Sequence, residues 1–272
     1  MTKERLDVLL VERKLIDTRE KAKRLIMAGQ VYSENTRLDK AGTKYDNDIP
    51  LTVKGNLPYV SRGGLKLEKA LNEFDISVAN KTIVDIGSST GGFSDCALQN
   101  DAKLIYAIDV GYNQLDWKIR SDKRVIVMEK TNFRYVTPDN FPKGLPEFAM
   151  IDVSFISLSL ILPVLKQVLK SNGDVVTLIK PQFEARKEEV GKKGIIRDIK
   201  THERVLQRVI DFIHENGYNI HEITYSPITG GGGNIEFLAH LSLGEKITKA
   251  DINVKEIVAN AHQALTKKTL KE

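Results

Sequence analysis

Asp85-Ile-Gly-Ser-Ser-Thr-Gly-Gly-Phe93 is the stretch that decides the fold of this chain of 272 residues. The β-branched run Lys81–Asp85 before it predicts a strand, and Phe93–Leu98 after it predicts the start of a helix. Glycines in the turn let the backbone bend tightly and approach a ligand without a Cβ in the way. A strand, a glycine turn and a helix whose free N–H groups point at the turn form the first unit of a Rossmann-like α/β sheet.

The glycine spacing distinguishes between cofactors. Dinucleotide sites use G-x-G-x-x-G, whereas Ser89 stands here in the place of the second glycine. An acid two residues before the first glycine suits a cationic ligand, and S-adenosylmethionine carries a sulfonium and an α-amino group. Because a glycine turn can also be a plain connection, a second acid matters: Asp109 ends the predicted strand Leu104–Asp109, where an acid can take ribose hydroxyls.

The cofactor site predicted from this pattern is formed by the two acids, the turn between them and a polar residue after the third strand, placed to edge the adenine. Its members are Asp85, Gly87, Ser88, Ser89, Gly91, Gly92, Asp109 and Asn132.

Further predicted strands place more charged residues at one edge of the sheet. Asp152 and Lys180 end the strands Phe148–Asp152 and Asp174–Lys180, as Asp85 and Asp109 end theirs. Ligands of such sheets bind at the carboxyl ends of the parallel strands. One charged residue at a strand end is common, but four on one edge beside a glycine turn indicate a site. The other predicted elements are a strand at 124–128, helices at 157–170 and 201–215, a charged loop at 181–198, and strands at 220–225 and 235–243.

Composition narrows the class of protein. The net charge of +5 and pI near 9.0 mildly favour an anionic partner. The single cysteine excludes a disulfide framework and fits a reducing cytosol. The charged start Met1–Arg5 is unlike a secretory signal, and no apolar run reaches the roughly 18 residues of a bilayer span. We expect a cytoplasmic protein without stable membrane insertion, and no protein partner is indicated.

The amino-terminal region has a different character. The run Arg5–Val11 and the segment Thr18–Met27 predict two helices, the second with Thr18 as N-cap and Gly29 after its end. Six Lys or Arg residues stand against two acids between Arg13 and Arg24, which could equally be a solvated helix surface. Short strands are predicted at 30–35, with a hairpin turn, and at 45–53.

The pattern R-L-D-x-L-L followed by T-R-E-K-A-K-x-L-I-x-A-G-x-V resembles the small RNA-binding domain first seen in ribosomal protein S4, over about Arg5 to Val53. The resemblance implies basic residues near RNA phosphates, in contacts that position RNA without reading its sequence. The predicted RNA-binding set is Arg5, Arg19, Lys23, Arg24 and Arg62.

Two lysines and two carboxylates form the candidate catalytic group: Lys66, Asp152, Lys180 and Glu236. A ribose hydroxyl is a poor nucleophile until its proton is removed, and a desolvated lysine beside another cation can be neutral and accept it. We predict Lys180 as the base, with Lys66 lowering its pKa and holding the hydroxyl oxygen. Asp152 and Glu236 would orient the two lysines.

A Lys-Asp-Lys-Glu order together with D-I-G-S-S-T-G-G-F resembles the FtsJ-type ribose 2′-O-methyltransferases. Over nearly its whole length, including Y-V-S-R-G-G-L-K-L, D-V-G-Y-N-Q-L-D-W, I-K-P-Q-F-E and G-G-G-G-N-I-E-F, the chain is similar to the TlyA family, which is also described as haemolysin-like. That resemblance implies 2′-O-methylation of cytidine in ribosomal RNA, within ribosomal subunits, with S-adenosylmethionine as cofactor.

Other functions fit the residues less well. A base C5-methyltransferase needs a nucleophilic cysteine, and Cys96 falls inside a predicted helix. An exocyclic-amine methyltransferase usually has Asn/Asp-Pro-Pro-aromatic where this chain has Asp152–Phe155, and five scattered histidines predict no metal site. A non-catalytic RNA-binding or ribosome assembly factor with a vestigial methyltransferase fold, and a membrane-active haemolysin, remain as alternatives.

The predicted domain organisation follows from these segments. We expect an α+β S4-like RNA-binding domain at 1–54, a linker at 55–61, an FtsJ-type methyltransferase domain at 62–246 and a basic helical tail at 247–272.

Overall fold

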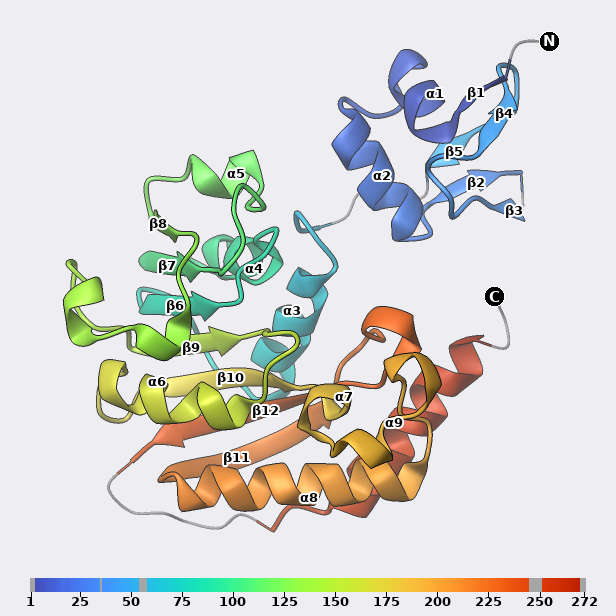
Figure 1. Ribbon diagram of the computed structural model, residues 1–272. Helices are drawn as coiled ribbons and strands as arrows, with labels where there is room; N and C mark the ends of the chain where they lie inside the picture. Colours follow the sequence, from blue (N-terminus) through green and yellow to red (C-terminus); the bar gives the residue numbers. More distant parts are fainter. Residues whose placement is uncertain (1–2, 35, 54–57, 245–250, 270–272) are drawn as a thin grey trace. The chain divides into compact units, whose positions relative to one another are not determined.

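The computed structural model describes residues 3–34, 36–53, 58–244 and 251–269 (Figure 1). It divides into two compact units, with the division after Arg62, one residue beyond the predicted start of the methyltransferase domain. Parts of every predicted segment lie outside the described residues: positions 1–2, 35 and 54 of the S4-like domain, 55–57 of the linker, 245–246 of the methyltransferase domain, and 247–250 and 270–272 of the tail.

The amino-terminal unit is a small α+β fold. Helices α1 (Leu6–Glu12) and α2 (Arg19–Met27) pack together, and α2 is capped by the Thr18 side chain, which accepts a hydrogen bond from the Lys21 N–H at 3.2 Å. Both predicted helices are thus confirmed. The strands form a pair, β1 (Lys3–Arg5) with β4 (Lys44–Asp46), and a three-stranded sheet of β3 (Thr36–Arg37), β2 (Val31–Ser33) and β5 (Thr52–Val53).

The second unit is built on a seven-stranded sheet of order β11-β12-β10-β9-β6-β7-β8. Strand β12 runs antiparallel to both of its neighbours, β10 and β11, whereas the neighbouring strands from β10 to β8 are parallel. The central strands therefore deliver their carboxyl ends to one edge. The predicted Rossmann-like sheet is confirmed. Its strands are β6 (Thr82–Ile86), β7 (Leu104–Ile108), β8 (Val125–Met128), β9 (Phe148–Ile151), β10 (Asp174–Ile179), β11 (Tyr218–Tyr225) and β12 (Phe237–Leu243).

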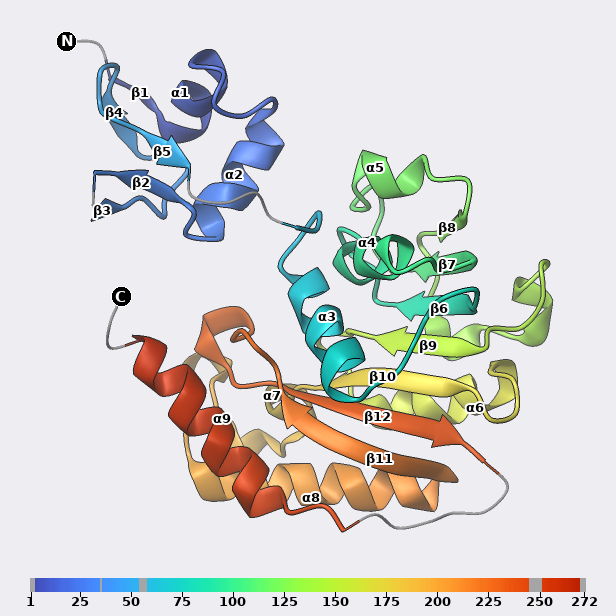
Figure 2. The same ribbon diagram turned by 180° about the vertical axis from the view of Figure 1, so that it is seen from behind.

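Helices cover both faces of this sheet. Figures 1 and 2 show α3 (Gly63–Glu73) and α4 (Gly92–Gln99) on one face, and α6 (Leu162–Val168) and α8 (Ile199–Glu215) on the other. The main core cluster lies between the strands and α6, α8 and α9 (Val254–Thr269). A four-residue helix, α5 (Trp117–Arg120), precedes β8. Among the described residues, no helix combines the length and the apolar character needed to cross a bilayer.

The structure corrects several predicted elements. The 157–170 helix is shorter, because Pro163 lacks an N–H and so stands at the start of α6, after a short 3-10 turn. The predicted loop 181–198 contains a short helix, α7 (Pro181–Glu184), and two 3-10 turns. Glu236 immediately precedes β12 instead of lying inside it.

The carboxy-terminal segment also differs from the separate basic tail that we expected at 247–272. Helix α9 buries Val258, Ala261 and Leu265 in the same core cluster as α8 and β11. An amphipathic helix with such a face belongs to the domain that it covers, and α9 is part of the second compact unit.

The turn after β6 packs closely against the backbone that follows β9. Gly87 has φ +84°, and a Cβ built there would lie 2.7 Å from the Asp152 carbonyl oxygen. Gly144 has a comparable φ of +101° but open space around its Cβ position. Substitution of Gly144 would therefore introduce backbone strain alone, whereas substitution of Gly87 would introduce both strain and a steric clash.

We predict that Gly144→Ala lowers the free energy of unfolding by roughly 1 kcal/mol, from strain at positive φ alone. Gly87→Ala adds a clash with backbone and should cost about 3 kcal/mol or more. Urea unfolding followed by circular dichroism measures both. Equal losses in the two variants would contradict the close packing of β6 against β9.

Candidate active site

The four predicted catalytic residues converge at the carboxyl edge of the sheet. Lys66 Nζ lies 2.6 Å from Glu236 Oε2 and 3.8 Å from Asp152 Oδ2. Lys180 Nζ lies 2.6 Å from the other oxygen, Oδ1, of Asp152. Carboxylates and ammonium groups therefore alternate in the order Glu236, Lys66, Asp152, Lys180, and we call this group the tetrad.

The topology explains why these distant residues meet. Asp152 and Lys180 directly follow the adjacent parallel strands β9 and β10. The antiparallel register pairs Ile179 with Phe237, which brings Glu236 beside Lys180 at the same edge. Lys66 reaches the site from the first turns of α3, and its side chain, like those of Lys180 and Glu236, is less than one-tenth exposed.

Glu236 is held in a space that only a glycine leaves open. A Cβ built on Gly230 would lie 2.0 Å from Glu236 Oε1. The G-G-G-G-N segment before β12 therefore gives the carboxylate room to reach Lys66. Burial of a carboxylate to this degree requires a partner, and the Lys66 hydrogen bond supplies it.

Ser154 is a member of the site that sequence reasoning missed. Lys180 Nζ donates a hydrogen bond to Ser154 Oγ at 2.9 Å. The contact of Lys180 with Asp152 Oδ1 is shorter, but that oxygen has no aligned hydrogen bond, so we treat it as an ion pair held by charge. The signal in the sequence was the position of Ser154 two residues after Asp152, just past a strand end.

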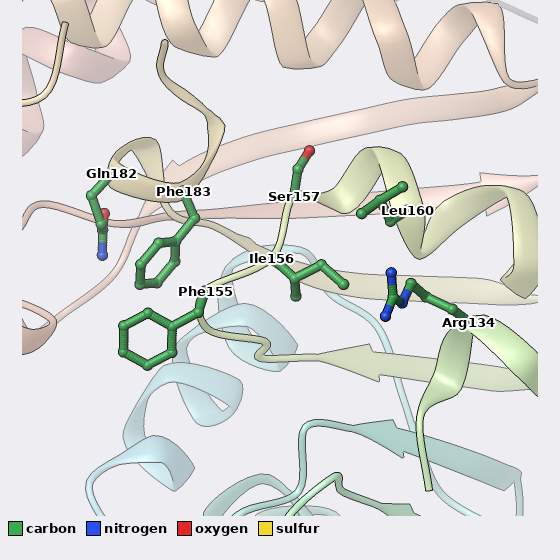
Figure 3. A pocket seen from close by; sticks show the side chains of 7 residues that line it. All are labelled: Arg134, Phe155, Ile156, Ser157, Leu160, Gln182 and Phe183. Carbon is green, nitrogen blue, oxygen red and sulfur yellow. The ribbon is translucent and has the colours of Figure 1, made fainter. Parts of the chain in front are cut away.

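Two phenylalanines beside the tetrad were also missed. Phe155 is 89% exposed and adopts φ +63°, an unfavourable conformation for a bulky residue. Its ring centroid lies 5.1 Å from that of Phe183, which belongs to α7. Both rings line a cleft of about 580 Å³, shown in Figure 3, whose other lining residues are Arg134, Ile156, Ser157, Leu160 and Gln182.

Glu184 fastens the segment after β9 to the segment after β10. Its Oε1 accepts a hydrogen bond from the Leu158 N–H at 2.8 Å, and its Oε2 accepts one from Ser157 Oγ at 2.7 Å. Burial raises the pKa of Glu184, although these two hydrogen bonds oppose the shift. The two loops that carry the tetrad residues Asp152 and Lys180 are therefore tied together.

The predicted cofactor turn carries a buried, incompletely paired acid. Asp85 is fully buried; its Oδ2 accepts a hydrogen bond from Ser94 Oγ at 2.6 Å, while its Oδ1 has no hydrogen-bond partner. Burial raises the pKa of Asp85 to about 7, with smaller contributions from Asp152 and Asp109, although the Ser94 hydrogen bond lowers it. An orphaned carboxylate oxygen of this kind is a natural partner for a cationic ligand.

The rest of the turn is fastened to β7. The N–H groups of Gly87 and Ser88 both donate to the Ile108 carbonyl, and Gly91 adopts φ +91° just before α4 begins at Gly92. Asp109, at the end of β7, accepts hydrogen bonds from the N–H groups of Ser89 at 2.8 Å and Gly111 at 2.7 Å. The two predicted acids thus lie at adjacent strand ends, joined by the glycine turn.

Asn132 has a structural contact of its own. It follows β8 and caps a 3-10 turn, where its Oδ1 accepts from the Arg134 N–H at 3.2 Å. A role at an adenine edge would have to use its remaining amide group.

The predicted RNA-binding cations lie in the first unit, and two of them share one buried acid. Arg5 contacts Asp7 at 2.9 Å and Arg19 contacts it at 3.1 Å, while both arginines remain about half exposed. Burial alone would raise the pKa of Asp7, but the hydrogen bonds from Arg5 and Arg19 outweigh it, so the pKa is lowered. Lys23 and Arg24 are half-buried on α2, and Arg62 is exposed.

Comparisons with known proteins agree with this geometry. The model of the FtsJ-like methyltransferase family matches residues 59–243, and the S4 domain model matches residues 4–46. The chain is 64% identical to the Bacillus subtilis protein YqxC, over 98% of this chain and 96% of that protein. It is 36% identical to the 16S/23S rRNA (cytidine-2′-O)-methyltransferase TlyA of Mycobacterium tuberculosis, over 96% and 97% of the two chains.

Among solved structures, one of a Streptococcus thermophilus protein has a TM-score of 0.81 and 52% identity, with both chains covered in full. The fold, the alternating tetrad and the matched regions lead to one assignment. This chain belongs to the FtsJ-like methyltransferase family, in the group that includes TlyA, and carries an S4 domain before its methyltransferase domain.

Proposed function

We propose that this protein transfers a methyl group from S-adenosylmethionine to the 2′-hydroxyl of a cytidine in ribosomal RNA. The observation that carries the proposal is the tetrad, in which a buried lysine that can act as base lies at the end of β10 between Asp152 and Ser154. The relationship to TlyA supports the choice of cytidine and of ribosomal RNA as substrate.

The cofactor site fits S-adenosylmethionine. The orphaned Oδ1 of Asp85 offers an acceptor for an ammonium group, and the glycine turn brings backbone close to it. Asp109 offers carboxylate oxygens for ribose hydroxyls, each already accepting one backbone N–H and able to accept another hydrogen bond. S-adenosylmethionine carries no phosphate groups, so its site needs no phosphate-binding residues and can contain the two acids Asp85 and Asp109.

The tetrad can activate the ribose hydroxyl. S-adenosylmethionine supplies a methyl group whose bond to sulfur breaks, with the electron pair left on sulfur, as the 2′-oxygen bonds to the carbon. Lys180 takes the hydroxyl proton on Nζ and later releases it to solvent. Lys66, held by Glu236, donates toward the same oxygen, and Asp152 keeps both lysines in place.

The exposed ring of Phe155 marks where the target base would lie. Base–aromatic stacking contributes roughly 1–3 kcal/mol per base in single-stranded RNA recognition. Phe155 directly follows the Ser154 that contacts Lys180, so a base on this ring would have its ribose near the tetrad. The backbone at Phe155 has a positive φ, a strained conformation for a bulky residue, and strain of this kind is often found at functional sites.

The alternatives are less well supported. Cys96 is fully buried within α4, where it cannot attack a base. A non-catalytic assembly factor would not need three buried charged groups alternating with the partly buried Asp152, since each costs free energy to desolvate. An assay of methyl transfer by the purified protein distinguishes an enzyme from a non-catalytic assembly factor directly.

Lys180→Arg tests the base. A guanidinium keeps the ion pair with Asp152 but does not lose its proton, so we expect methyl transfer to fall by at least a hundredfold. The assay uses labelled S-adenosylmethionine, saturating, with unmodified ribosomal subunits. Unchanged cofactor affinity is the control for folding, and a near-normal rate would remove Lys180 from the role of base.

Asp85 makes cofactor affinity depend on pH. Because the folded pKa is about 7, the carboxylate loses its charge as pH falls, and affinity should fall with it between about pH 7.5 and pH 5.5. Ser94→Ala removes a hydrogen bond that favours the charged form, so the midpoint should move to higher pH. Calorimetric titration measures both.

Asp85→Asn should give weak, pH-independent binding over the same range. In the cofactor-free protein the sign is reversed: folded Asp85 holds a proton that the unfolded chain releases, so its contribution to stability falls as pH rises from 3.8 to about 7. Cofactor affinity that stays flat in the wild type would contradict the assignment of Asp85.

Lys23 tests the RNA surface of the first unit. Arg19 is unsuitable, because its replacement also disturbs buried Asp7. Lys23→Gln should weaken RNA binding and reduce the slope of log affinity against log salt by about one. Lys21→Gln is the matched control on another face of α2, where Lys21 already pairs with Asp17 at 3.0 Å. Equal effects of the two changes would count against a specific RNA face.

A further inference from the structure

We infer that Ser154 is a positioning residue for the methyl-transfer step: its hydroxyl fixes the orientation of the Lys180 amine toward the ribose hydroxyl. The inference rests on the proposed function. Its basis is the hydrogen bond of 2.9 Å from Lys180 Nζ to Ser154 Oγ. The Lys180 side chain is only 9% exposed, whereas Ser154 is exposed to solvent.

A lysine amine can accept a proton only along its lone pair. The neutral amine has two N–H bonds and one lone pair in a tetrahedral arrangement, and rotation about the Cε–Nζ bond moves all three together. Attraction by charge alone leaves that rotation free. A directional hydrogen bond restricts it to the orientations in which an N–H points at the acceptor, and a second contact from another direction selects among these. Lys180 has two such contacts, one with Asp152 and one with Ser154.

The two contacts differ in kind. Asp152 Oδ1 attracts Nζ at 2.6 Å by charge but without an aligned hydrogen bond. Within the described part of the chain, Ser154 provides the directional hydrogen bond on this amine. A hydroxyl also suits the task because it is neutral: a second carboxylate in its place would favour the ammonium form, which cannot act as a base.

Ser154 can serve as a reference point only if its own loop is fixed. The loop is anchored on both sides. Before Ser154, the Asp152 N–H donates to the Ile86 carbonyl at 3.0 Å; after it, the Leu158 N–H and Ser157 Oγ both donate to the half-buried Glu184. Because Glu184 lies four residues after Lys180, the same clamp holds the lysine segment and the serine segment in register.

The arrangement predicts which kinetic quantity responds. Removal of the hydroxyl leaves Nζ beside Asp152 but free to turn, so a smaller fraction of bound complexes has the lone pair aimed at the 2′-oxygen. The rate of the chemical step should fall, while binding of cofactor and RNA should not. Misorientation of a reacting group by about 1 Å can cost on the order of a hundredfold in rate.

The test compares Ser154→Ala and Ser154→Thr with the wild type in single-turnover methyl transfer on unmodified ribosomal subunits. Ser154→Ala should lower the rate by roughly ten- to a hundredfold, with less than about a twofold change in cofactor dissociation constant or in the RNA concentration at half-maximal rate. Ser154→Thr keeps a hydroxyl and should recover most of the rate. Ser159→Ala is the matched control, because Ser159 is an exposed serine of the same segment whose hydroxyl contacts Ser157 Oγ and not the tetrad. The Ser157 contact with Glu184 does not depend on that hydroxyl.

The outcomes separate this inference from the proposed function. A wild-type rate in Ser154→Ala overturns the positioning role and leaves the methyltransferase assignment intact. So does a parallel loss of rate, cofactor affinity and melting temperature in both variants, because that pattern reports a structural role. Absence of methyl transfer in the wild type would instead overturn the proposed function, and this inference with it.

Discussion

Asp152 forms ion pairs with both Lys66 and Lys180, and the arrangement of the candidate active site depends on these two contacts. Three charged side chains, those of Lys66, Lys180 and Glu236, are buried at one sheet edge beside the partly exposed Asp152. Each buried charge is tolerated because its neighbour has the opposite charge. The alternation makes the group electrically neutral as a whole. In the proposed reaction Lys180 would take the proton of the ribose hydroxyl, so the interactions that allow burial of the lysine would also position it for that step.

The strands of the sheet determine where the charged residues of the site lie. Parallel strands deliver Asp85, Asp109, Asp152 and Lys180 to one edge, and the antiparallel β12 adds Glu236 from the far end of the chain. Glycines at 87 and 230 allow contacts that a Cβ would block, with the Asp152 carbonyl in one case and with the Glu236 carboxylate in the other. The cofactor turn and the tetrad are therefore adjacent because β6 and β9 pair directly.

The sequence predicted the sheet, the two helices of the first unit and the convergence of the tetrad, because each follows from periodicity or from strand ends that parallel pairing must bring together. It could not predict the Ser154 contact, the exposed Phe155 or the Glu184 clamp, since these depend on the course of loops in space. Helix α9 was misjudged as a tail because a basic composition concealed its apolar face. The pairing of Arg5 and Arg19 through buried Asp7 was equally invisible to charge counting.

The central claim is that the tetrad directs methylation to a ribose oxygen. Its most direct test is incubation of the purified chain with labelled S-adenosylmethionine and unmodified ribosomal subunits, then digestion of the RNA to nucleosides and mass spectrometry. The account predicts that the label appears in 2′-O-methylcytidine and is absent with Lys180→Ala. Label on a base-methylated nucleoside, or label that persists without the lysine, would contradict it.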